Sequence, residues 1–432
     1  MTTGDGPLRV ALLAYRGKPH IGGQGVYVRH LSSALAGLGH HVEVLGGQPY
    51  PELDEGVALV ELRSLDIYND HFPMRMPGVW ELKHWTDFVE VASFSFGTFP
   101  EPLAFSLRAW EHLRRRPADF DLVHDNQSLG YGLLAIQRFL PVIGTIHHPI
   151  PVDRRLAIDH APSPYRAITL RRWYAFTRMQ TRVARRLRRV ITVSESSSRD
   201  IQRDHNVARD RLHVVPVGVD PERFRPLPGV ARVPGRVVTT ASADVTMKGL
   251  RFLREAMAKL RTERDVSLVV IGRPRENGAS ADAIARLGLT SAVEFVSGVS
   301  DQRIYELYAE AEVAVVPSLY EGFSLPAVEA MACAVPLVAT TGGALPEVVG
   351  ANCDTALLVP PGDSGALAAA IGAALDDPEL RARVGAAGRR RVIERWSWRR
   401  TAERTVDQYR ALLSDRDRAG PRSGPPRLPA GP

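Results

Sequence analysis

The sequence predicts an α/β protein made of two Rossmann-like, doubly wound domains, each with a mostly parallel sheet. Short apolar runs alternate with helical patterns along the chain, and a stretch rich in proline and glycine divides this alternation into two series. The length of 432 residues also suits two domains. The predicted boundaries are an N-terminal domain at 1–217, a linker at 218–235 and a C-terminal domain at 236–396.

The first series opens with a strand at 8–14, then a glycine-rich turn that leads into a helix. A strand at 41–45 completes a βαβ unit, and later strands end near His124, Ile146 and Ser194. The aromatic and proline-rich stretch at 71–102 is less regular. We interpret it as a long insertion that shapes a binding cleft, because long irregular loops in α/β domains are usually functional or disordered.

The second series repeats the alternation, which favours right-handed crossovers and a second parallel sheet. Its strands are expected at 236–241, 267–271, 292–296, 312–316, 336–340 and 355–359. A helical pattern follows at 397–414. The tail at 415–432 is Arg, Gly and Pro with little to bury, so we expect it to be disordered.

Composition limits the cellular setting. No apolar run approaches the ~18 residues of a membrane-spanning helix. The polar start leads directly into a strand, so no secretory signal is expected. Cys333 and Cys353, the two cysteines, lack metal-site spacing and suit a reducing cytoplasm.

The net charge of +7 is concentrated in an arginine-rich segment at 166–189. Apolar residues such as Trp173, Phe176 and Leu187 recur there at spacings of three and four, which indicates an amphipathic helix with a basic face. Two interpretations stay open: a packed helix with a solvated outer face, or contact with an anionic membrane. Nucleic acid is the least favoured partner, because no nucleic-acid-binding motif accompanies the charge.

Two glutamates, Glu321 and Glu329, follow an apolar run that reads as a buried parallel strand. A strand, a short loop and a helix start form the place where α/β sheets bind anions. Ser324 suits the N-cap, so the backbone N–H groups of Ser324 and Leu325 are expected to point at a phosphate. Glu329, one turn into the helix, is placed to reach a ribose diol. The alternative is two solvated glutamates favoured by the helix dipole.

This segment resembles the E-x7-E signature of retaining glycosyltransferases of family 4, which have the GT-B fold of two domains facing across a cleft. The resemblance implies that Glu321 holds hydroxyls of the transferred sugar and that Glu329 holds the nucleotide ribose. It further implies that the nucleotide sugar is bound by the residues that follow the first glutamate, which are Gly322, Phe323, Ser324 and Leu325. It also implies that the helix at 397–414 crosses back to the first domain.

Three glycines, Gly22, Gly23 and Gly25, resemble the glycine-rich loop after the first strand of that family. Close backbone approach there lets amides meet the donor phosphate and the acceptor. The alternative is a turn that simply starts a helix. The run lacks the complete G-x-G-x-x-G of a dinucleotide site, which counts against a dehydrogenase.

Thr145-Ile146-His147 resembles the T-x-H of the family, which implies that His147 contacts the 6-hydroxyl of the donor hexose. An imidazole can donate and accept hydrogen bonds there without acting as a base. The adjacent His148 is an alternative for this role, and His147 bonded to a backbone carbonyl is the purely structural alternative. His124, with Asp125 and Asn126, ends another strand and is interpreted as lining the acceptor side.

Lys248-Gly249 resembles the K-G of the family's diphosphate site, where a lysine offsets charge that grows on the leaving group. The family usually has an arginine five residues earlier, and here that position is Ala243. Arg273, after the next strand, is interpreted as a replacement, with an exposed surface arginine as the alternative. Val299 matches the loop that meets the nucleobase.

The resemblance implies transfer of a hexosyl unit, with retention, from a UDP- or GDP-hexose to a saccharide or lipid acceptor. The catalytic residues would be His147, Lys248 and Glu321, in a front-face reaction, since no motif supplies the nucleophile of a retaining glycosidase. No cofactor is expected, and no metal site, because no D-x-D motif occupies a corresponding position. Gly342, Gly343 and Glu347 are interpreted as closing the sugar pocket, with a surface role for Glu347 left open.

Two other functions stay open. A hydrolysing nucleotide-sugar epimerase can share the GT-B fold, and a noncatalytic membrane-associated binding protein can be built on an inactivated transferase. The E-x7-E and K-G motifs together favour the transferase. The expected location is cytoplasmic, with peripheral contact at the inner membrane face as an open alternative.

Overall fold

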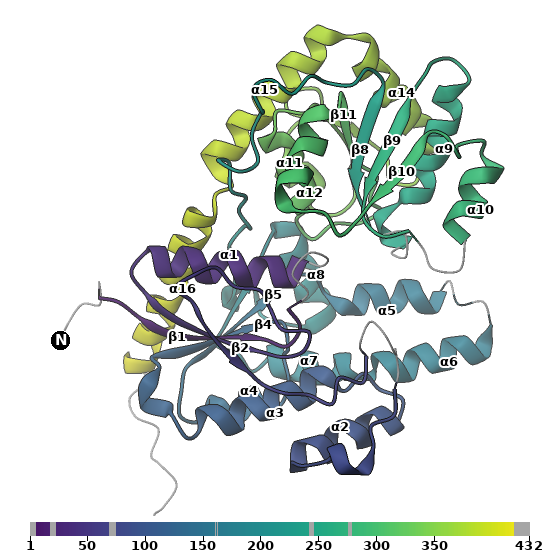
Figure 1. The fold of residues 1–432 in the computed structure, drawn as a ribbon. Coiled ribbons are helices and arrows are strands. Elements are labelled where there is room, and N and C mark those ends of the chain that lie inside the picture. The colour runs from purple at the N-terminus through teal and green to yellow at the C-terminus, as the bar shows by residue number, and fades with distance from the viewer. Residues whose placement is uncertain are drawn as a thin grey trace, which may run out of the picture.

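The computed structural model describes residues 6–17, 23–68, 75–159, 161, 163–241, 246–274 and 279–418. Figure 1 shows two α/β halves, with the last helix running from the second half back along the first. Each half holds one parallel sheet with helices on its faces, so the predicted fold class is confirmed.

The first sheet has seven strands in the order β3-β2-β1-β4-β5-β6-β7. Their bounds are β1 Arg9–Ala14, β2 His41–Gly46, β3 Ala58–Glu61, β4 Leu122–Asn126, β5 Val142–Ile146, β6 Arg189–Thr192 and β7 Leu212–Val214. β1 pairs with both β2 and β4, with Val10 opposite Val42 on one side and Leu122 on the other. The edge strands β3 and β7 were not predicted, because both are short and only partly buried.

The second sheet has six strands in the order β10-β9-β8-β11-β12-β13. Their bounds are β8 Arg236–Thr240, β9 Ser267–Ile271, β10 Val293–Val296, β11 Val313–Val316, β12 Leu337–Thr340 and β13 Leu357–Val359. All four residues of β11 and of β12 are buried, as parallel strands covered on both faces require.

Helices cover both sheets. In the first half they are α1 Gly23–Gly37, α2 Trp85–Ser95, α3 Glu101–Leu113, α4 Gly132–Ile136, α5 Ile150–Asp159, α6 Pro164–Trp173, α7 Thr177–Ala184 and α8 Glu195–His205. In the second half they are α9 Leu250–Arg261, α10 Ala279–Arg286, α11 Asp301–Glu310, α12 Leu325–Ala332, α13 Leu345–Val349, α14 Ser364–Asp376, α15 Pro378–Arg395 and α16 Trp398–Arg418. Within the described residues, no helix is both long and apolar enough to cross a membrane.

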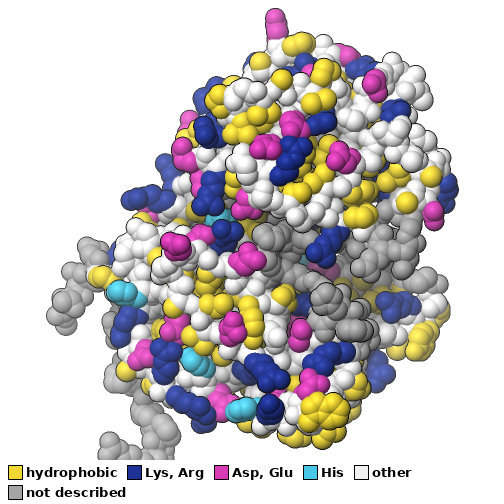
Figure 2. All heavy atoms as spheres, in the orientation of Figure 1, with side chains coloured by type: hydrophobic (Ala, Val, Ile, Leu, Met, Phe, Trp, Pro, Cys, Tyr) yellow, Lys and Arg dark blue, Asp and Glu magenta, His cyan; other side chains and the backbone are white. Residues whose placement is uncertain are grey.

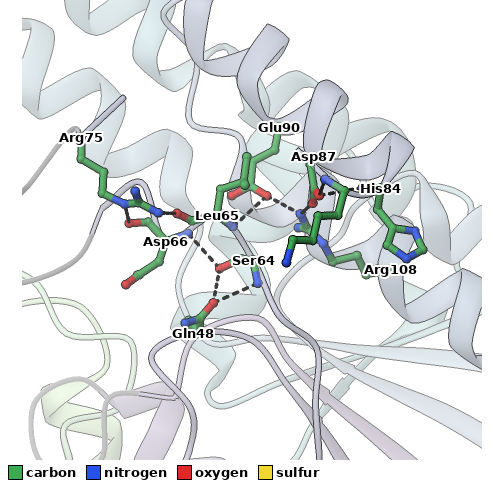
Figure 3. A network of polar contacts seen from close by, with 10 residues as sticks. Gln48, Ser64, Leu65, Asp66, Arg75, His84, Asp87, Glu90 and Arg108 are labelled. Carbon is green, nitrogen blue, oxygen red and sulfur yellow. Dashed lines mark hydrogen bonds and ion pairs between the residues drawn. The ribbon is translucent and has the colours of Figure 1, made fainter. Parts of the chain in front are cut away.

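The stretch predicted as an irregular insertion is largely helical where the structure describes it. It holds the short 3-10 helix η1 (Val79–Glu81), α2 and the start of α3, while 71–74 lie outside the described residues. A buried polar network holds α2 in place (Figure 3): Arg108 Nη2 lies 2.7 Å from Asp87 Oδ1 and 2.6 Å from Glu90 Oε2. The irregular loop was therefore a wrong prediction. The polar side of α2 faces inward, which obscures the usual helix pattern.

The arginine-rich segment forms two helices, α6 and α7, joined by the 3-10 helix η3 (Tyr174–Phe176), in place of the single helix predicted. Met179, Val183 and Leu187 are buried in the core of the first half. Trp173 packs edge-on against Tyr68 with ring centroids 5.0 Å apart. The apolar stripe is thus used for packing over α7, as the first of the two interpretations expects.

α16 joins the two halves. Its first residue, Trp398, stacks on His30 of α1 with ring centroids 5.1 Å apart, and Thr401 Oγ1 donates to Pro216 O at 2.9 Å. Further along, Tyr409 is fully buried against the first sheet. The helix extends to Arg418, past the expected end, and the rest of the predicted tail lies outside the described residues.

Candidate active site

Lys248 and Glu321 meet at the carboxyl edge of the second sheet. Lys248 follows β8 and ends the 3-10 helix η5 (Thr246–Lys248), and Glu321 lies in the loop between β11 and α12. Lys248 Nζ lies 2.8 Å from Glu321 Oε1, and Ser318 Oγ donates to the same oxygen at 2.6 Å. Glu321 is buried, and about a third of the Lys248 side chain is exposed. A partly open cation beside a held carboxylate suits binding of an anionic sugar derivative.

Two glycines allow this close packing. Gly249 has a φ of +66°, and a Cβ there would lie 1.9 Å from Pro317 O. Gly343 has a φ of +63°, and a Cβ there would lie 2.3 Å from Glu321 O. Both positions therefore require glycine. The backbone of Glu321 is held further by the N–H of Ala344, which donates to Glu321 O at 2.9 Å.

Ser324 precedes α12 at the N-cap position but does not cap the helix as expected. Its φ is 92° and its side chain makes no cap hydrogen bond. Its Oγ is buried and has no partner among the described residues. A serine held in an unfavourable backbone conformation with an unpaired hydroxyl at a helix start is a feature of binding sites.

Glu329 lies one turn into α12, partly buried, beside Tyr308 of α11. Tyr308 OH donates to Glu329 Oε2 at 3.2 Å and lies 2.8 Å from Thr240 Oγ1. Burial raises the pKa of Glu329 to about 7, and the hydrogen bond from Tyr308 opposes this rise. Its carboxyl group therefore titrates near neutral pH.

His147 follows β5 at the carboxyl edge of the first sheet. Its Nε2 lies 2.6 Å from Asn126 Oδ1, and its ring packs edge-on against Tyr27 with centroids 4.4 Å apart. The side chain of Gln127 accepts from His147 N at 2.8 Å and donates to His148 O at 2.7 Å. Burial lowers the pKa of His147 to about 3, so the ring is neutral at physiological pH.

The two edges meet at Gly322. A Cβ there would lie 2.6 Å from His147 O, so the loop that carries Glu321 packs directly on the loop that carries His147. Ser197 Oγ of α8 donates to Gly322 O at 3.2 Å. The structure thus brings the three predicted catalytic residues to one junction between the halves.

Glu347 contacts the first half. Its two carboxylate oxygens accept from Glu195 N at 2.9 Å and Ser196 N at 3.2 Å, at the start of α8. Nearby, Tyr320 OH donates to Asp200 in a short hydrogen bond. Glu347 is exposed, as its surface interpretation expects, and its carboxylate caps a helix of the other half.

Other predicted donor-site residues make fewer contacts with the described residues. Arg273 is exposed after β9 and makes no hydrogen bond or ion pair with the described residues, and Val299 is partly buried before α11. Gly23 and Gly25 lie in the first turn of α1, while Gly22 and Ala243 lie outside the described residues. The Phe323 ring packs against Trp396 with centroids 5.5 Å apart, so this side chain belongs to the core.

His124 does not line an acceptor surface. It is fully buried, with Nδ1 2.6 Å from Tyr409 OH and Nε2 2.6 Å from Thr145 Oγ1. Asp125 is also buried, and accepts from Leu129 N at 2.9 Å. Burial favours neutral forms, lowering the pKa of His124 to about 3 and raising that of Asp125 to about 6. The prediction for His124 was wrong, because α16 covers that end of the strand.

The sequence did not predict that Asn126 and Gln127 bond to His147, or that Tyr308 bonds to Glu329. The only sequence signal was the position of Asn126 and Gln127 at the end of a strand, where parallel sheets place polar groups. Tyr308 lies in a helix with no motif. The described residues contain no group of three or more His, Cys, Asp or Glu arranged to hold a metal ion.

Family comparisons cover both halves. Residues 21–223 match the family Glycosyltransferase Family 4, and residues 231–391 match the family Glycosyl transferases group 1. Among solved structures, sucrose-phosphate synthase from Thermosynechococcus elongatus superimposes with a TM-score of 0.72 at 23% identity, covering 94% of this chain and 100% of that one. The Anabaena protein HepE in complex with UDP-glucose gives a TM-score of 0.68 at 18% identity, with 94% and 100% covered.

Curated relatives are similar over nearly the whole chain. The MMP alpha-(1->4)-mannosyltransferase of Mycolicibacterium hassiacum is 49% identical over 409 residues, which cover 94% of this chain and 99% of the relative. The D-inositol 3-phosphate glycosyltransferase of Streptomyces scabiei is 28% identical over 449 residues, covering 95% and 93%. With both halves matched and a 49% identical relative spanning the chain, this protein belongs to the glycosyltransferases of family 4 and has the GT-B fold.

Proposed function

We propose that this glycosyltransferase moves a mannosyl unit from a nucleotide-sugar donor to a saccharide acceptor with retention of anomeric configuration. The pairing of Lys248 with Glu321 beside the start of α12 carries the proposal. The mannosyltransferase named for the 49% identical relative supports mannose as the sugar, and the α-(1→4) linkage in that name supports a saccharide acceptor. Structures of HepE with UDP and UDP-glucose support a nucleotide-sugar donor.

Each residue at the junction has a proposed task. Lys248 and the backbone N–H groups at the start of α12 would hold the diphosphate, where helix dipole and ammonium both favour negative charge. Glu321 and His147 would hold hydroxyls of the hexose, and Glu329 the ribose diol. Donor binding would exchange the Lys248 contact with Glu321 for one with phosphate, which frees a Glu321 oxygen for the sugar.

The proposed reaction occurs on one face of the sugar. The bond from C1 to the diphosphate oxygen breaks, the bond from C1 to the acceptor oxygen forms on the same face, and the acceptor proton passes to the departing diphosphate. Charge grows on the leaving oxygens in the transition state, so Lys248 contributes more there than in the ground state. A nucleophile on the opposite face, as in retaining glycosidases, is not required.

The test is a donor panel of UDP- and GDP-linked glucose and mannose, each incubated with an α-(1→4)-linked mannooligosaccharide. We expect one extended oligosaccharide by mass spectrometry and an α-anomeric signal by NMR, with transfer abolished in Glu321→Gln. A β-linked product would contradict retention. Release of an epimerised free sugar would favour the hydrolysing epimerase, and an inert protein that still binds nucleotide would favour the noncatalytic interpretation.

We also propose peripheral contact of a cytoplasmic protein with anionic membrane, through the outward face of α2. Trp85, Phe88 and Phe96 are 44%, 58% and 75% exposed, and Trp80 just before them is 82% exposed. Hydrophobic side chains gather at this end of the molecule in Figure 2. Exposed aromatic residues suit the membrane interface, and nearby cations add attraction to anionic lipid.

Arginines from α6 support this surface. A Cβ at Gly97, just past α2, would lie 3.9 Å from Arg172 Cβ, so the end of α2 adjoins the basic end of α6. Arg171 and Arg172 are exposed and form no ion pair with described residues. Flotation with liposomes containing phosphatidylglycerol should therefore show salt-sensitive binding that Phe88→Ser weakens. Ile393→Ser, which removes a 48% exposed residue from α15, is the matched control, and equal loss in both variants would overturn the proposal.

A further inference from the structure

The side-chain amide of Asn126 forms hydrogen bonds through both its nitrogen and its oxygen. Asn126 ends β4, is almost fully buried, and its Nδ2 donates to Gln24 O at 3.3 Å, while its Oδ1 lies 2.6 Å from His147 Nε2. A backbone carbonyl can only accept, so the amide nitrogen faces Gln24 and the amide oxygen faces His147. This orientation fixes the proton on the histidine ring, because an amide oxygen needs a donor opposite it.

We propose that Asn126 is a positioning residue that holds His147 as the Nε2–H tautomer, so that Nδ1 faces the donor sugar as a hydrogen-bond acceptor. The inference rests on the proposed function for its substrate, a hexose whose hydroxyl donates to Nδ1. It also assigns the direction of that hydrogen bond: the sugar hydroxyl donates and the histidine accepts. A group that offers only an acceptor at this position would be rejected.

Nδ1 is available for this contact. None of the described residues hydrogen-bonds to it, whereas Nε2 is bonded to Asn126. The ring itself is held on its other sides, edge-on against Tyr27 at 4.4 Å and through the backbone by Gln127. Gln127 has a φ of 62°, which is uncommon for residues other than glycine. Its side-chain amide bonds to both His147 N and His148 O.

The surroundings keep the ring neutral. Tyr27 on α1, His124 on β4 and the neighbouring His148 are the titratable side chains next to His147, and no carboxylate contacts it among the described residues. A neutral ring with one proton has one acceptor, and the bond to Asn126 determines which nitrogen that is. Neutral tautomers of a free imidazole otherwise interconvert, so loss of Asn126 would leave the acceptor nitrogen unspecified.

The first experiment reads the tautomer directly, by ¹⁵N NMR of histidine in the ligand-free full chain. We expect the Nε2–H form for His147 in the wild type and a mixture in Asn126→Leu. Thr181→Val is the matched control, because Thr181 Oγ1 lies 2.9 Å from the buried His205 Nδ1 at a site away from the junction. An Nδ1–H form of His147 in the wild type would overturn the proposal.

The second experiment uses kinetics of mannosyl transfer. Asn126→Leu should lower kcat/KM by about five- to tenfold, as expected for one misplaced hydrogen bond, with Thr181→Val near wild type. Asn126→Asp should create an acid limb in the pH profile, because a carboxylate next to Nε2 favours the doubly protonated ring, which has no acceptor at Nδ1. An unchanged profile in Asn126→Asp and unchanged kcat/KM in Asn126→Leu would overturn the role of Asn126. Normal transfer by His147→Ala would instead overturn the sugar contact of the proposed function, since the tautomer is measured without substrate.

Discussion

Glu329 is a carboxyl group whose charge changes within the physiological pH range. Its pKa is raised from 4.5 to about 7 by burial, so below pH 7 the protonated form predominates in the free protein. A ribose diol donates two hydrogen bonds and prefers the ionised carboxylate as acceptor. We therefore expect the affinity for nucleoside diphosphate to increase as pH rises from 6 to 8. Below the pKa of Glu329 the increase should be up to about tenfold for each pH unit.

The control for this prediction is Glu329→Gln, whose neutral amide does not titrate. The ratio of the two dissociation constants, measured by calorimetry, removes the titration of the diphosphate itself. Tyr308→Phe should move the rise to higher pH, because the lost hydrogen bond lowers the pKa of Glu329 in the wild type. A ratio that does not change with pH would show that Glu329 is not the ribose acceptor.

At the residue scale, sequence predicted the groups that carry motifs and missed the groups that hold them. Glu321 and Lys248 were found from short local patterns, and the structure brings them to within 2.8 Å. Asn126 is 21 positions from His147, and Tyr308 is 21 positions from Glu329. Such partners become neighbours only when separate elements pack, so no local spacing reveals their role.

α2 shows how an element can reverse the usual rule of apolar inside and polar outside. Its buried side holds Asp87 and Glu90, paired with Arg108, while its aromatic residues face outward. Burial raises the pKa of Glu90, with Arg108 opposing the rise. The helix is therefore held by charge pairing, and its stability depends on one guanidinium group.

Arg108→Met should destabilise the protein by about 3–5 kcal/mol at pH 7.5, because it leaves two buried carboxyl groups without their cation. Glu90 has a folded-state pKa above its unfolded value, so protonation at lower pH relieves the buried charge and the loss should shrink toward pH 5. Urea unfolding at both pH values measures this. Glu90→Gln is the control and should cost much less, and equal losses in the two variants would contradict the charge-pairing account.

At the element scale, buried parallel strands were predicted well because continuous apolar runs have few alternative structures. Edge strands and α2 were missed for opposite reasons: β3 is partly exposed and has no strong pattern, and the aromatic residues of α2 face outward. The break between α6 and α7 was also missed. Apolar spacing continues across η3 even though a 3-10 turn interrupts the α-helix, so periodicity alone does not locate the break.

On the scale of the whole molecule, two sets of hydrogen bonds between described residues join the two halves, beside an ion pair of Arg29 with Asp301 at 3.8 Å. α16 and the linker form one connection, where Val219 N donates to Trp396 O at 3.0 Å. The other is the start of α8, where Glu347, Gly322 and Tyr320 of the second half all bond to the first half. The second connection includes the residues on both sides of Glu321, so the contacts that join the halves also hold the loop that carries this carboxylate.

Glu347→Ala should weaken this second connection without touching the nucleotide-binding residues. The carboxylate caps two free N–H groups and faces the positive end of α8, an interaction worth about 1–2 kcal/mol. Its loss should enlarge the radius of gyration in small-angle scattering and raise KM for the donor sugar, while affinity for the nucleoside diphosphate alone stays near wild type. Glu379→Ala is the matched control, because Glu379 is likewise an exposed glutamate in the first turn of a helix, α15, and makes no hydrogen bond to the described residues of the first half. An unchanged scattering profile and KM in Glu347→Ala would mean that the bond at α8 does not hold the halves together. Equal changes in Glu347→Ala and Glu379→Ala would point instead to a general effect of removing surface charge.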